Sequence, residues 1–292
     1  MKLATINQNN QEIAAIMVED RLFPLPIVNE NYSTDWNDTL DQILENNKLE
    51  ELISWFNNEG KESLENTQKL GLPYSGVNFG PLYRHPHKIW GIGLNYRDHA
   101  KDLSEKTPSS IPASFMKSDT TIIGPNDTIL IPKQSSKTTG EAELGVIIKE
   151  RCKNVQRKNW LDVVAGFTTI IDMTAEDILR QNTRYLTLSK NFDTFFSFGP
   201  LLITPDEFTD IMKLSVATVI NGEVYAKNTV SNMTFLPDFL VSFHSEIMTL
   251  LPGDIISTGT PRAVQLEDGD IIECQIDGFP PLKNSVKDLK SI

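Results

Sequence analysis

From residue 88 onward the chain is a succession of short apolar runs separated by Gly, Pro, Asn and Asp. Such runs, bounded by turn-forming residues, predict β-strands. Because no regular helices intervene, the pattern favours a rolled or sandwiched, mostly antiparallel sheet over a doubly wound parallel one. The predicted strands cover residues 89–93, 121–123, 128–131, 144–148, 163–171, 214–220, 254–258 and 270–276.

Two local signals refine this reading. Asn221-Gly222 directly follows an apolar run and predicts a type I′ hairpin, since both central positions of that turn require positive φ. Helical patterns are fewer: residues 174–184, with Thr174 as the expected cap, and residues 237–250.

Residues 1–83 differ from the rest of the chain. They contain apolar runs at 2–6 and 13–18, and then a helical periodicity over 36–56 that Ser33 or Asp35 is expected to cap. Nothing in this part has a catalytic pattern. The sequence therefore predicts an α+β, mostly β protein with a small N-terminal α/β domain (1–83) and a larger catalytic domain (84–292).

The charge balance limits the partners. With 27 Lys and Arg against 39 Asp and Glu, the net charge of −12 would repel nucleic acid and anionic membranes. No apolar run reaches the length of roughly 18 residues expected of a membrane span, and the first residues do not form a secretory signal. Cys152 and Cys274 do not make a disulfide framework, so we expect two reduced thiols and a cytoplasmic location.

The most informative short motif is Glu141-Ala-Glu143, which is followed at once by the apolar run 144–148. If the strand continues back through Glu141, the two carboxylates project from one face, roughly 6.6 to 6.8 Å apart along the chain. They can then converge on one cation that prefers oxygen ligands. An exposed strand face is the alternative, but two carboxylates beside an apolar run would be costly unless neutralised.

A third carboxylate, Asp172, closes the apolar run 163–171. A lone Asp at such a place is often only a turn former, but Thr174 already offers the helix cap here. Three carboxylates without histidine or thiolate favour Mg²⁺, Mn²⁺ or Ca²⁺ over Zn²⁺.

Three further residues have the chemistry of an active site. His99 lies on the turn after a predicted strand, and Asp102 follows three residues later, where a short helix would place it beside the imidazole as the orienter of a general base. Lys190 precedes an aromatic-rich run and either lies at an edge or pairs with a buried anion. His85, His87 and His244 are interpreted as linker or packed residues.

Taken together, these residues resemble the fumarylacetoacetate hydrolase family over roughly 200 residues. The matching motifs, in order, are Gly93-Leu-Asn-Tyr-Arg-Asp-His99, Phe115-Met-Lys117, Ile123-Gly-Pro125, Glu141-x-Glu143-Leu144, Gly166-Phe167 with Asp172, Ser189-Lys-x-Phe-Asp193, Gly199-Pro200, Asn221-Gly-Glu223, Met233, Leu251-Pro-Gly-Asp254 and Thr258-Gly-Thr-Pro261.

The resemblance implies a mixed β-roll, a homodimer, and Mg²⁺ or Mn²⁺ held by Glu141, Glu143 and Asp172. It implies that His99, its carboxylate partner and Lys190 serve the chemistry. The substrate contacts expected from it are Tyr96, Lys190, Gly259 and Thr260.

Several positions depart from the family pattern. Ile171 and Glu176 stand where the family usually has Asn and an arginine that contacts the far end of the substrate, and Ala263 replaces a glycine. The shorter Asp102 replaces the usual Glu, with Glu105 as the alternative partner of His99. For Glu176 three outcomes remain open: the substrate carries a single carboxylate, Arg180 or Arg184 replaces the missing arginine, or Glu176 points to solvent.

The resemblance implies a metal-dependent enzyme that acts on a 2-oxo acid through an enolate. The leading expectation is hydrolysis of the carbon–carbon bond of an acylpyruvate or similar β-diketo acid. Decarboxylation of an oxaloacetate-like acid and isomerisation are the alternatives within this chemistry. The alternative from another class is a relative that binds ligand without turnover.

Overall fold

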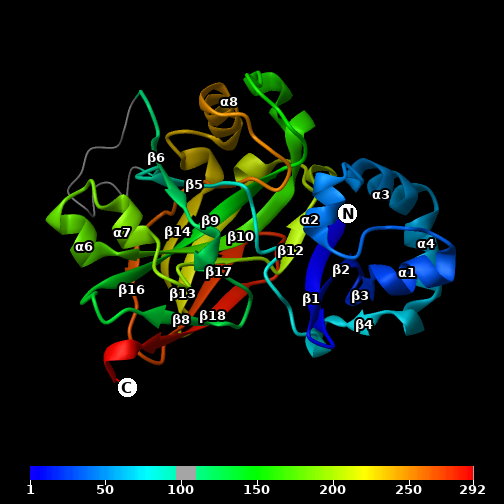
Figure 1. Cartoon of the computed structure of the whole chain (residues 1–292), viewed down its shortest axis with the longest axis horizontal. Coiled ribbons are helices and arrows are strands. Elements are labelled where there is room, and N and C mark those ends of the chain that lie inside the picture. Colours follow the sequence, from blue (N-terminus) through cyan, green and yellow to red (C-terminus); the bar gives the residue numbers. More distant parts are fainter. Residues whose placement is uncertain (97–109, 292) are drawn as a thin grey trace.

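The computed structural model describes residues 1–96 and 110–291, and within them the strands form two sheets (Figure 1). A thirteen-stranded sheet has the main order β4-β3-β2-β1-β12-β10-β9-β15-β5-β6, with β7, β11 and β16 attached beside this path. A five-stranded sheet has the order β14-β13-β17-β18-β8. Both sheets mix parallel and antiparallel pairs, so the predicted mostly-β mixed fold is confirmed.

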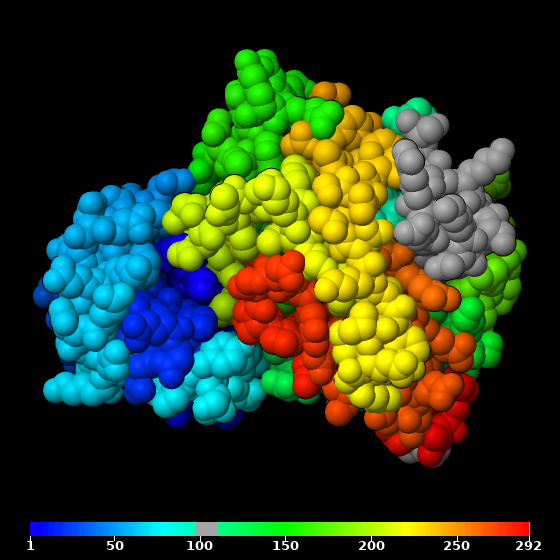
Figure 2. Space-filling model, turned by 180° about the vertical axis from the view of Figure 1, so that it is seen from behind, coloured from blue at the N-terminus to red at the C-terminus, as the bar shows by residue number. Residues whose placement is uncertain are grey.

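The N-terminal residues gather at one end of the molecule, where Figure 2 shows them in blue and cyan. Their strands nevertheless continue the large sheet, because Leu3 of β1 pairs antiparallel with Leu202 of β12. The elements of this part are β1 (Lys2–Gln8), β2 (Gln11–Val18), β3 (Arg21–Pro24), α1 (Leu25–Tyr32), α2 (Leu40–Glu45), α3 (Leu49–Trp55), a π-helical turn (Phe56–Gly60), α4 (Lys61–Asn66) and β4 (Leu72–Pro73). The division of the chain at residue 83 stays a prediction.

The single helix predicted over 36–56 is wrong, because the structure has α2 and α3 separated by residues 46–48. Asn47 adopts φ 54° there, a left-handed conformation that asparagine tolerates and that no helix can continue through. The residue before α2 is Thr39, so neither Ser33 nor Asp35 caps it.

Two long neighbouring strands run through the centre of the large sheet: β9 (Thr138–Ile148) and β10 (Val164–Ala175), buried along their whole length. They pair antiparallel with Glu141 opposite Asp172. The other elements of this part are β5 (Ile89–Gly93), β6 (Ala113–Lys117), β7 (Ile122–Ile123), β8 (Thr128–Ile131), α6 (Glu176–Gln181), α7 (Leu186–Lys190), β11 (Phe196–Phe198), β12 (Leu201–Ile203), β13 (Ser215–Ile220), β14 (Glu223–Thr229), α8 (Pro237–Ile247), β15 (Ile255–Ser257), β16 (Val264–Gln265), β17 (Ile271–Ile276) and β18 (Leu282–Asp288).

The turn between β13 and β14 is the predicted hairpin, with φ 52° at Asn221 and 83° at Gly222. The helix predicted from Thr174 is wrong in its start. β10 continues through Ala175 and α6 begins only at Glu176, so Thr174 is a strand residue and no cap. In the strand its side chain projects from the same sheet face as Glu141 of β9, to which its hydroxyl donates a hydrogen bond.

The two faces of β9 pack against different layers. Ala142, Leu144 and Val146 join the core cluster that includes Ile272 of the five-stranded sheet. Ile147, on the opposite face, joins a second cluster with residues of the N-terminal part such as Leu3. Within the described residues, no helix is both long enough and apolar enough to cross a membrane.

Candidate metal centre and active site

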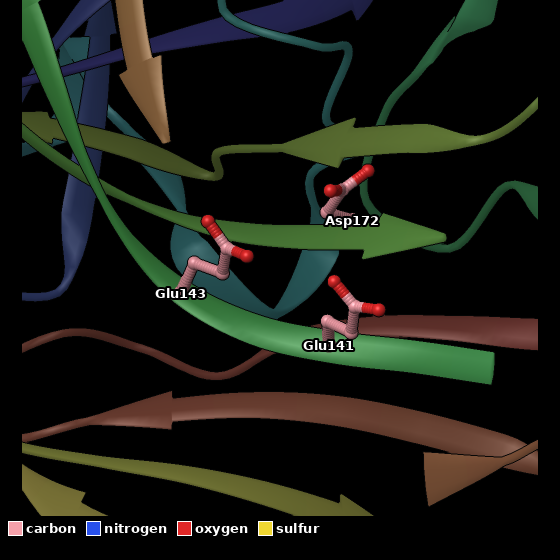
Figure 3. Close-up of side chains that lie close together, drawn as sticks. All are labelled: Glu141, Glu143 and Asp172. Carbon is pink, nitrogen blue, oxygen red and sulfur yellow. The ribbon is translucent and has the colours of Figure 1, made fainter. Parts of the chain in front are cut away.

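The three predicted carboxylates lie together on one face of the large sheet. Glu141 and Glu143 extend from β9 and Asp172 extends from the neighbouring strand β10, all toward the same side (Figure 3). One oxygen of each lies within 4.8 Å of the others. All three are buried, with exposed fractions of 6%, 2% and 0%.

The strand geometry explains this convergence. Residues two apart on β9 point to the same face, and the antiparallel register sets Asp172 directly opposite Glu141. Chain positions that are far apart thus supply three oxygen ligands within the reach of one cation.

Two buried lysines neutralise part of this charge. Lys190, at the end of α7, lies 2.8 Å from Glu141 Oε2 and 2.7 Å from Asp172 Oδ2. Lys117, at the end of β6, lies 2.7 Å from Asp172 Oδ1 and also donates to the carbonyl oxygen of Lys190. Each oxygen of Asp172 therefore faces one ammonium group.

Burial and ion pairing act in opposite directions on the pKa values of these groups. Burial alone would raise the pKa of Asp172, but Lys117 and Lys190 hold this pKa below its ordinary value. Burial opposes the charge of Lys190 too, yet Asp172 and Glu141 raise its pKa above the ordinary value. For Lys117 burial is the largest effect and lowers the pKa.

Glu143 is held by neutral donors instead. Ser257 Oγ donates to its Oε2 at 2.5 Å and the Gly259 N–H donates to the same oxygen at 2.8 Å. Burial, followed by the charges of Asp172 and Glu141, raises the pKa of Glu143 to about 8. This carboxyl is the group of the three that most lacks a positive partner.

Glu141 receives a further hydrogen bond from Thr174 Oγ1, at 2.7 Å. Thr174, predicted as a helix cap, thus positions a member of the carboxylate cluster. Cys274 lies nearby and donates to the carbonyl oxygen of Glu143, but burial raises the pKa of its thiol to about 12. Among the described residues, the donor set is therefore carboxylate oxygen only, as Mg²⁺ and Mn²⁺ prefer.

The other predicted site residues have different surroundings. Tyr96 is fully buried, and its hydroxyl has no hydrogen-bond partner within the described part of the chain. The Thr260 hydroxyl donates to the carbonyl oxygen of Arg262, and the Gly259 N–H is the one already bound to Glu143. Their contact with substrate stays a prediction. His99, Asp102 and Glu105 lie outside the described residues.

Glu176 does not point to solvent, so that alternative is wrong. Its side chain is 8% exposed and lies 2.9 Å from Lys137 Nζ and 2.5 Å from Arg180 Nε. Burial raises its pKa, but hydrogen bonds from Lys137 and Arg180 hold this pKa below the ordinary value. Glu176 is therefore an ionised carboxylate clamped between two cations.

Sequence reasoning assigned no role to Lys117 or Ser257, although Lys117 was part of a matching motif. The signal for Lys117 was its place at the end of an apolar strand, where a lysine that points inward needs a buried anion. No such signal marks Ser257, because the residue is an ordinary member of a short strand.

Comparison with known proteins agrees with this architecture. Residues 88–287 match the family model described as fumarylacetoacetate (FAA) hydrolase C-terminal. A human protein named oxaloacetate tautomerase FAHD2B, mitochondrial, is 35% identical over 224 residues, covering 74% of this chain and 71% of the human protein.

Solved structures match over the whole length. Fumarylacetoacetate hydrolase from Exiguobacterium antarcticum superposes with a TM-score of 0.80 at 26% identity, covering 99% of each chain. Maleylpyruvate hydrolase from Sphingobium sp. SYK-6, solved with manganese(II) and pyruvate, superposes with a TM-score of 0.78 at 24% identity, also over 99% of each chain. By its sequence match and its fold, the chain belongs to the fumarylacetoacetate hydrolase family.

Proposed function

We propose that this protein is a divalent-metal-dependent enzyme that hydrolyses the carbon–carbon bond of an acylpyruvate-like β-diketo acid. One observation carries the proposal: three buried carboxylates and two buried lysines share one face of a sheet. Structural ion-pair networks seldom bury so many charges, because each charge loses its hydration. The similarity to fumarylacetoacetate hydrolase supports hydrolysis as the outcome.

The proposed ligands are Glu141, Glu143 and Asp172, whose oxygens suit Mg²⁺ or Mn²⁺. When bound, such a cation supplies a Lewis acid that stabilises negative charge developing on a 2-oxo acid. The protein contributes the fixed positions of the three carboxylates, which two strands of one buried sheet hold rigidly.

The charge balance suits an anionic substrate. The three carboxylates outnumber the two lysines by one, so a divalent cation leaves the centre with one positive charge. A 2-oxo acid brings one carboxylate and neutralises it. As charge moves onto the substrate during reaction, the fixed ammonium of Lys190 stabilises it without rearrangement.

For the water that completes hydrolysis we propose His99 as general base, with Asp102 or Glu105 orienting its imidazole. The family relationship supports this assignment. A His99→Ala variant should bind metal as the parent protein does and should lose hydrolysis by a factor of roughly 10² to 10⁴.

Tautomerisation of oxaloacetate is the second candidate, and the similarity to the human tautomerase favours it. It needs the same enolate-stabilising groups, but only a proton transfer follows. The two candidates differ in products: hydrolysis of acetylpyruvate releases pyruvate, whereas tautomerisation changes the enol absorbance of oxaloacetate and releases none.

The test is an assay of purified protein with Mg²⁺ or Mn²⁺, acetylpyruvate and oxaloacetate, which follows pyruvate and enol absorbance separately. We expect metal-dependent release of pyruvate from acetylpyruvate. This release should be lost in Glu141→Gln, a variant that keeps the shape of the side chain and removes its charge. Turnover that survives exhaustive chelation would contradict the metal. Absence of any turnover, with 2-oxo acid binding retained, would favour a ligand-binding relative.

A further inference from the structure

A serine and a histidine meet on the side of β6 that faces away from the proposed metal centre. Along this strand Phe115 and Lys117 point to the metal side: the Lys190 ammonium lies 4.8 Å from the Phe115 ring centroid, and Lys117 contacts the carboxylate cluster. Because side chains alternate along a strand, Ser114 projects from the opposite side. Its hydroxyl lies 3.0 Å from Nε2 of His244 on α8. The pair is therefore separate from the carboxylate cluster.

The hydrogen bonds of His244 fix which ring nitrogen carries the proton. Its Nδ1 lies 2.8 Å from the Leu240 carbonyl oxygen, and because a carbonyl oxygen can only accept, Nδ1 must be the donor. Nε2 of the neutral imidazole is then the acceptor for the Ser114 hydroxyl. Burial lowers the pKa of His244, against the smaller opposite effect of the Leu240 bond, so the imidazole is neutral at physiological pH. A hydroxyl, a base and a third group that orients the base are the parts of an activated nucleophile.

The two partners differ in exposure. His244 is fully buried, and its ring packs against that of Trp90 with the ring centroids 4.7 Å apart. Ser114 is only partly buried. A ligand can therefore reach the hydroxyl while the imidazole behind it is held rigidly and shielded from water. The alternative is a purely structural hydrogen bond, which predicts an unreactive serine.

Trp90 also brings a hydrogen-bond donor to this side of the sheet. Its indole N–H is buried and has no hydrogen-bond partner among residues 1–96 and 110–291. Trp90 of β5 pairs with Met116 of β6, so Trp90 and Ser114 are diagonal neighbours on one face, a separation that an aromatic side chain spans. A negatively charged oxygen formed beside Ser114 would supply the acceptor that this N–H lacks.

From this geometry we infer that Ser114 is a second nucleophile, which takes the acyl group of small carboxylic esters with His244 as its general base. Ser114 Oγ bonds to the ester carbonyl carbon as its proton moves to His244 Nε2. The ester C–O bond then breaks, and the alcohol leaves with that proton. Water adds to the acyl-serine in the same way, which releases the carboxylic acid and restores the hydroxyl. This reaction uses no metal ion and lies beyond the proposed function.

Release of nitrophenolate from p-nitrophenyl acetate in the presence of EDTA measures this activity apart from the metal centre. Ser114→Ala and His244→Gln should each slow the release by at least about 10²-fold, because the nucleophile and its general base act together. His85→Gln is the matched control, since His85 is 80% exposed and bonds only an aspartate side chain within the described residues. This variant should keep the parental rate, and it measures the background reaction of an exposed imidazole.

A fluorophosphonate probe gives a measurement on the parent protein that does not depend on how a variant folds. Peptide mapping after incubation should find the probe on Ser114. Absence of the probe from Ser114 would overturn the inference. So would a parental rate of nitrophenolate release in Ser114→Ala or in His244→Gln. Neither result would affect the proposed function, because metal-dependent turnover of a 2-oxo acid should persist in Ser114→Ala.

Discussion

At the scale of single residues, the site shows how charge is kept in a buried place. Asp172 has an ammonium partner for each oxygen, whereas the partners of Glu143 within residues 1–96 and 110–291 are a hydroxyl and a peptide N–H. The difference places their pKa values on opposite sides of the ordinary range of a carboxyl group. A cation that joins them must therefore displace a proton from Glu143.

This gives a prediction about pH. Because the pKa of Glu143 is raised to about 8 from 4.5, the folded metal-free protein binds a proton that the unfolded chain does not, and its stability decreases as the pH rises through that interval. Mn²⁺ binding needs the ionised form, so the rise in Tm on adding Mn²⁺ should be larger at about pH 8 than at about pH 6. Thermal unfolding with and without Mn²⁺ measures it. A Tm rise that does not change over this range would contradict the assignment.

Lys117 provides a second test at this scale. Replacing it by Met leaves a buried carboxylate oxygen of Asp172 without its partner, which should destabilise the protein by about 3 to 5 kcal/mol. Lys213 is the matched control, since its side chain is 83% exposed and its ion pair with Asp210 is 3.6 Å long. Lys213→Met should change stability by less than about 0.5 kcal/mol. Urea unfolding compares the two, and similar losses would show that burial of the pair is unimportant.

At the scale of elements, strand periodicity accounts for what the sequence could predict. Glu141 and Glu143 were predictable as a pair because alternation along one strand brings them to one face. The contacts of Lys117 with Asp172 and of Ser257 with Glu143 were not predictable. They require β6 and β15 to lie next to β9 and β10, and the local sequence of β6 and β15 does not indicate this arrangement. The prediction that Thr174 caps a helix was wrong. A threonine before two acidic residues suits a helix cap, but pairing with Thr139 of β9 keeps Thr174 in the strand.

The loop after β15 supplies a prediction about an element. Gly259 has φ +97°, and an added Cβ would lie 2.8 Å from Asn95 Cβ and 2.9 Å from the Ile92 carbonyl oxygen. Gly259→Ala should therefore cost more than the about 1 to 3 kcal/mol of backbone strain alone, and it should weaken metal binding by displacing the N–H that holds Glu143.

Gly222→Ala is the control, because Gly222 also has positive φ but nothing lies within 4 Å of its added Cβ. Gly222→Ala should be destabilised only by the backbone strain, and its affinity for Mn²⁺ should be unchanged. Chemical denaturation and calorimetry separate the two effects. Equal metal affinity in the two variants would mean that the Gly259 N–H does not position Glu143.

At the scale of the whole molecule, one core cluster joins the N-terminal part to the central strands. Ile147 of β9 packs in the same cluster as Leu3 and Ile16 of the N-terminal strands, and β1 pairs with β12. The N-terminal part should therefore unfold together with the strands that carry the site. We expect a single calorimetric transition.

Ile147→Ala, which removes a fully buried side chain, should lower the free energy of unfolding by about 2 to 5 kcal/mol while the transition stays single. Hydrogen exchange of amides in β2 and β10 gives an independent measurement, since both should reach the same limiting protection. A separate, earlier transition of the N-terminal strands would show that the two parts are energetically independent.

The alternation along β9 also shapes how such an enzyme can diversify. Positions 140, 142 and 144 face the five-stranded sheet, where even an added Cβ at Gly140 would lie 2.3 Å from Ile272 Cδ1. Thr139 belongs to the opposite face and lines a pocket together with Lys137 and Glu176. A directed-evolution library confined to 137, 139 and 176 would therefore vary the lining of this pocket and leave the packed layer unchanged. Along this strand, positions that can change (evolvability) alternate in the sequence with positions that preserve the fold (robustness).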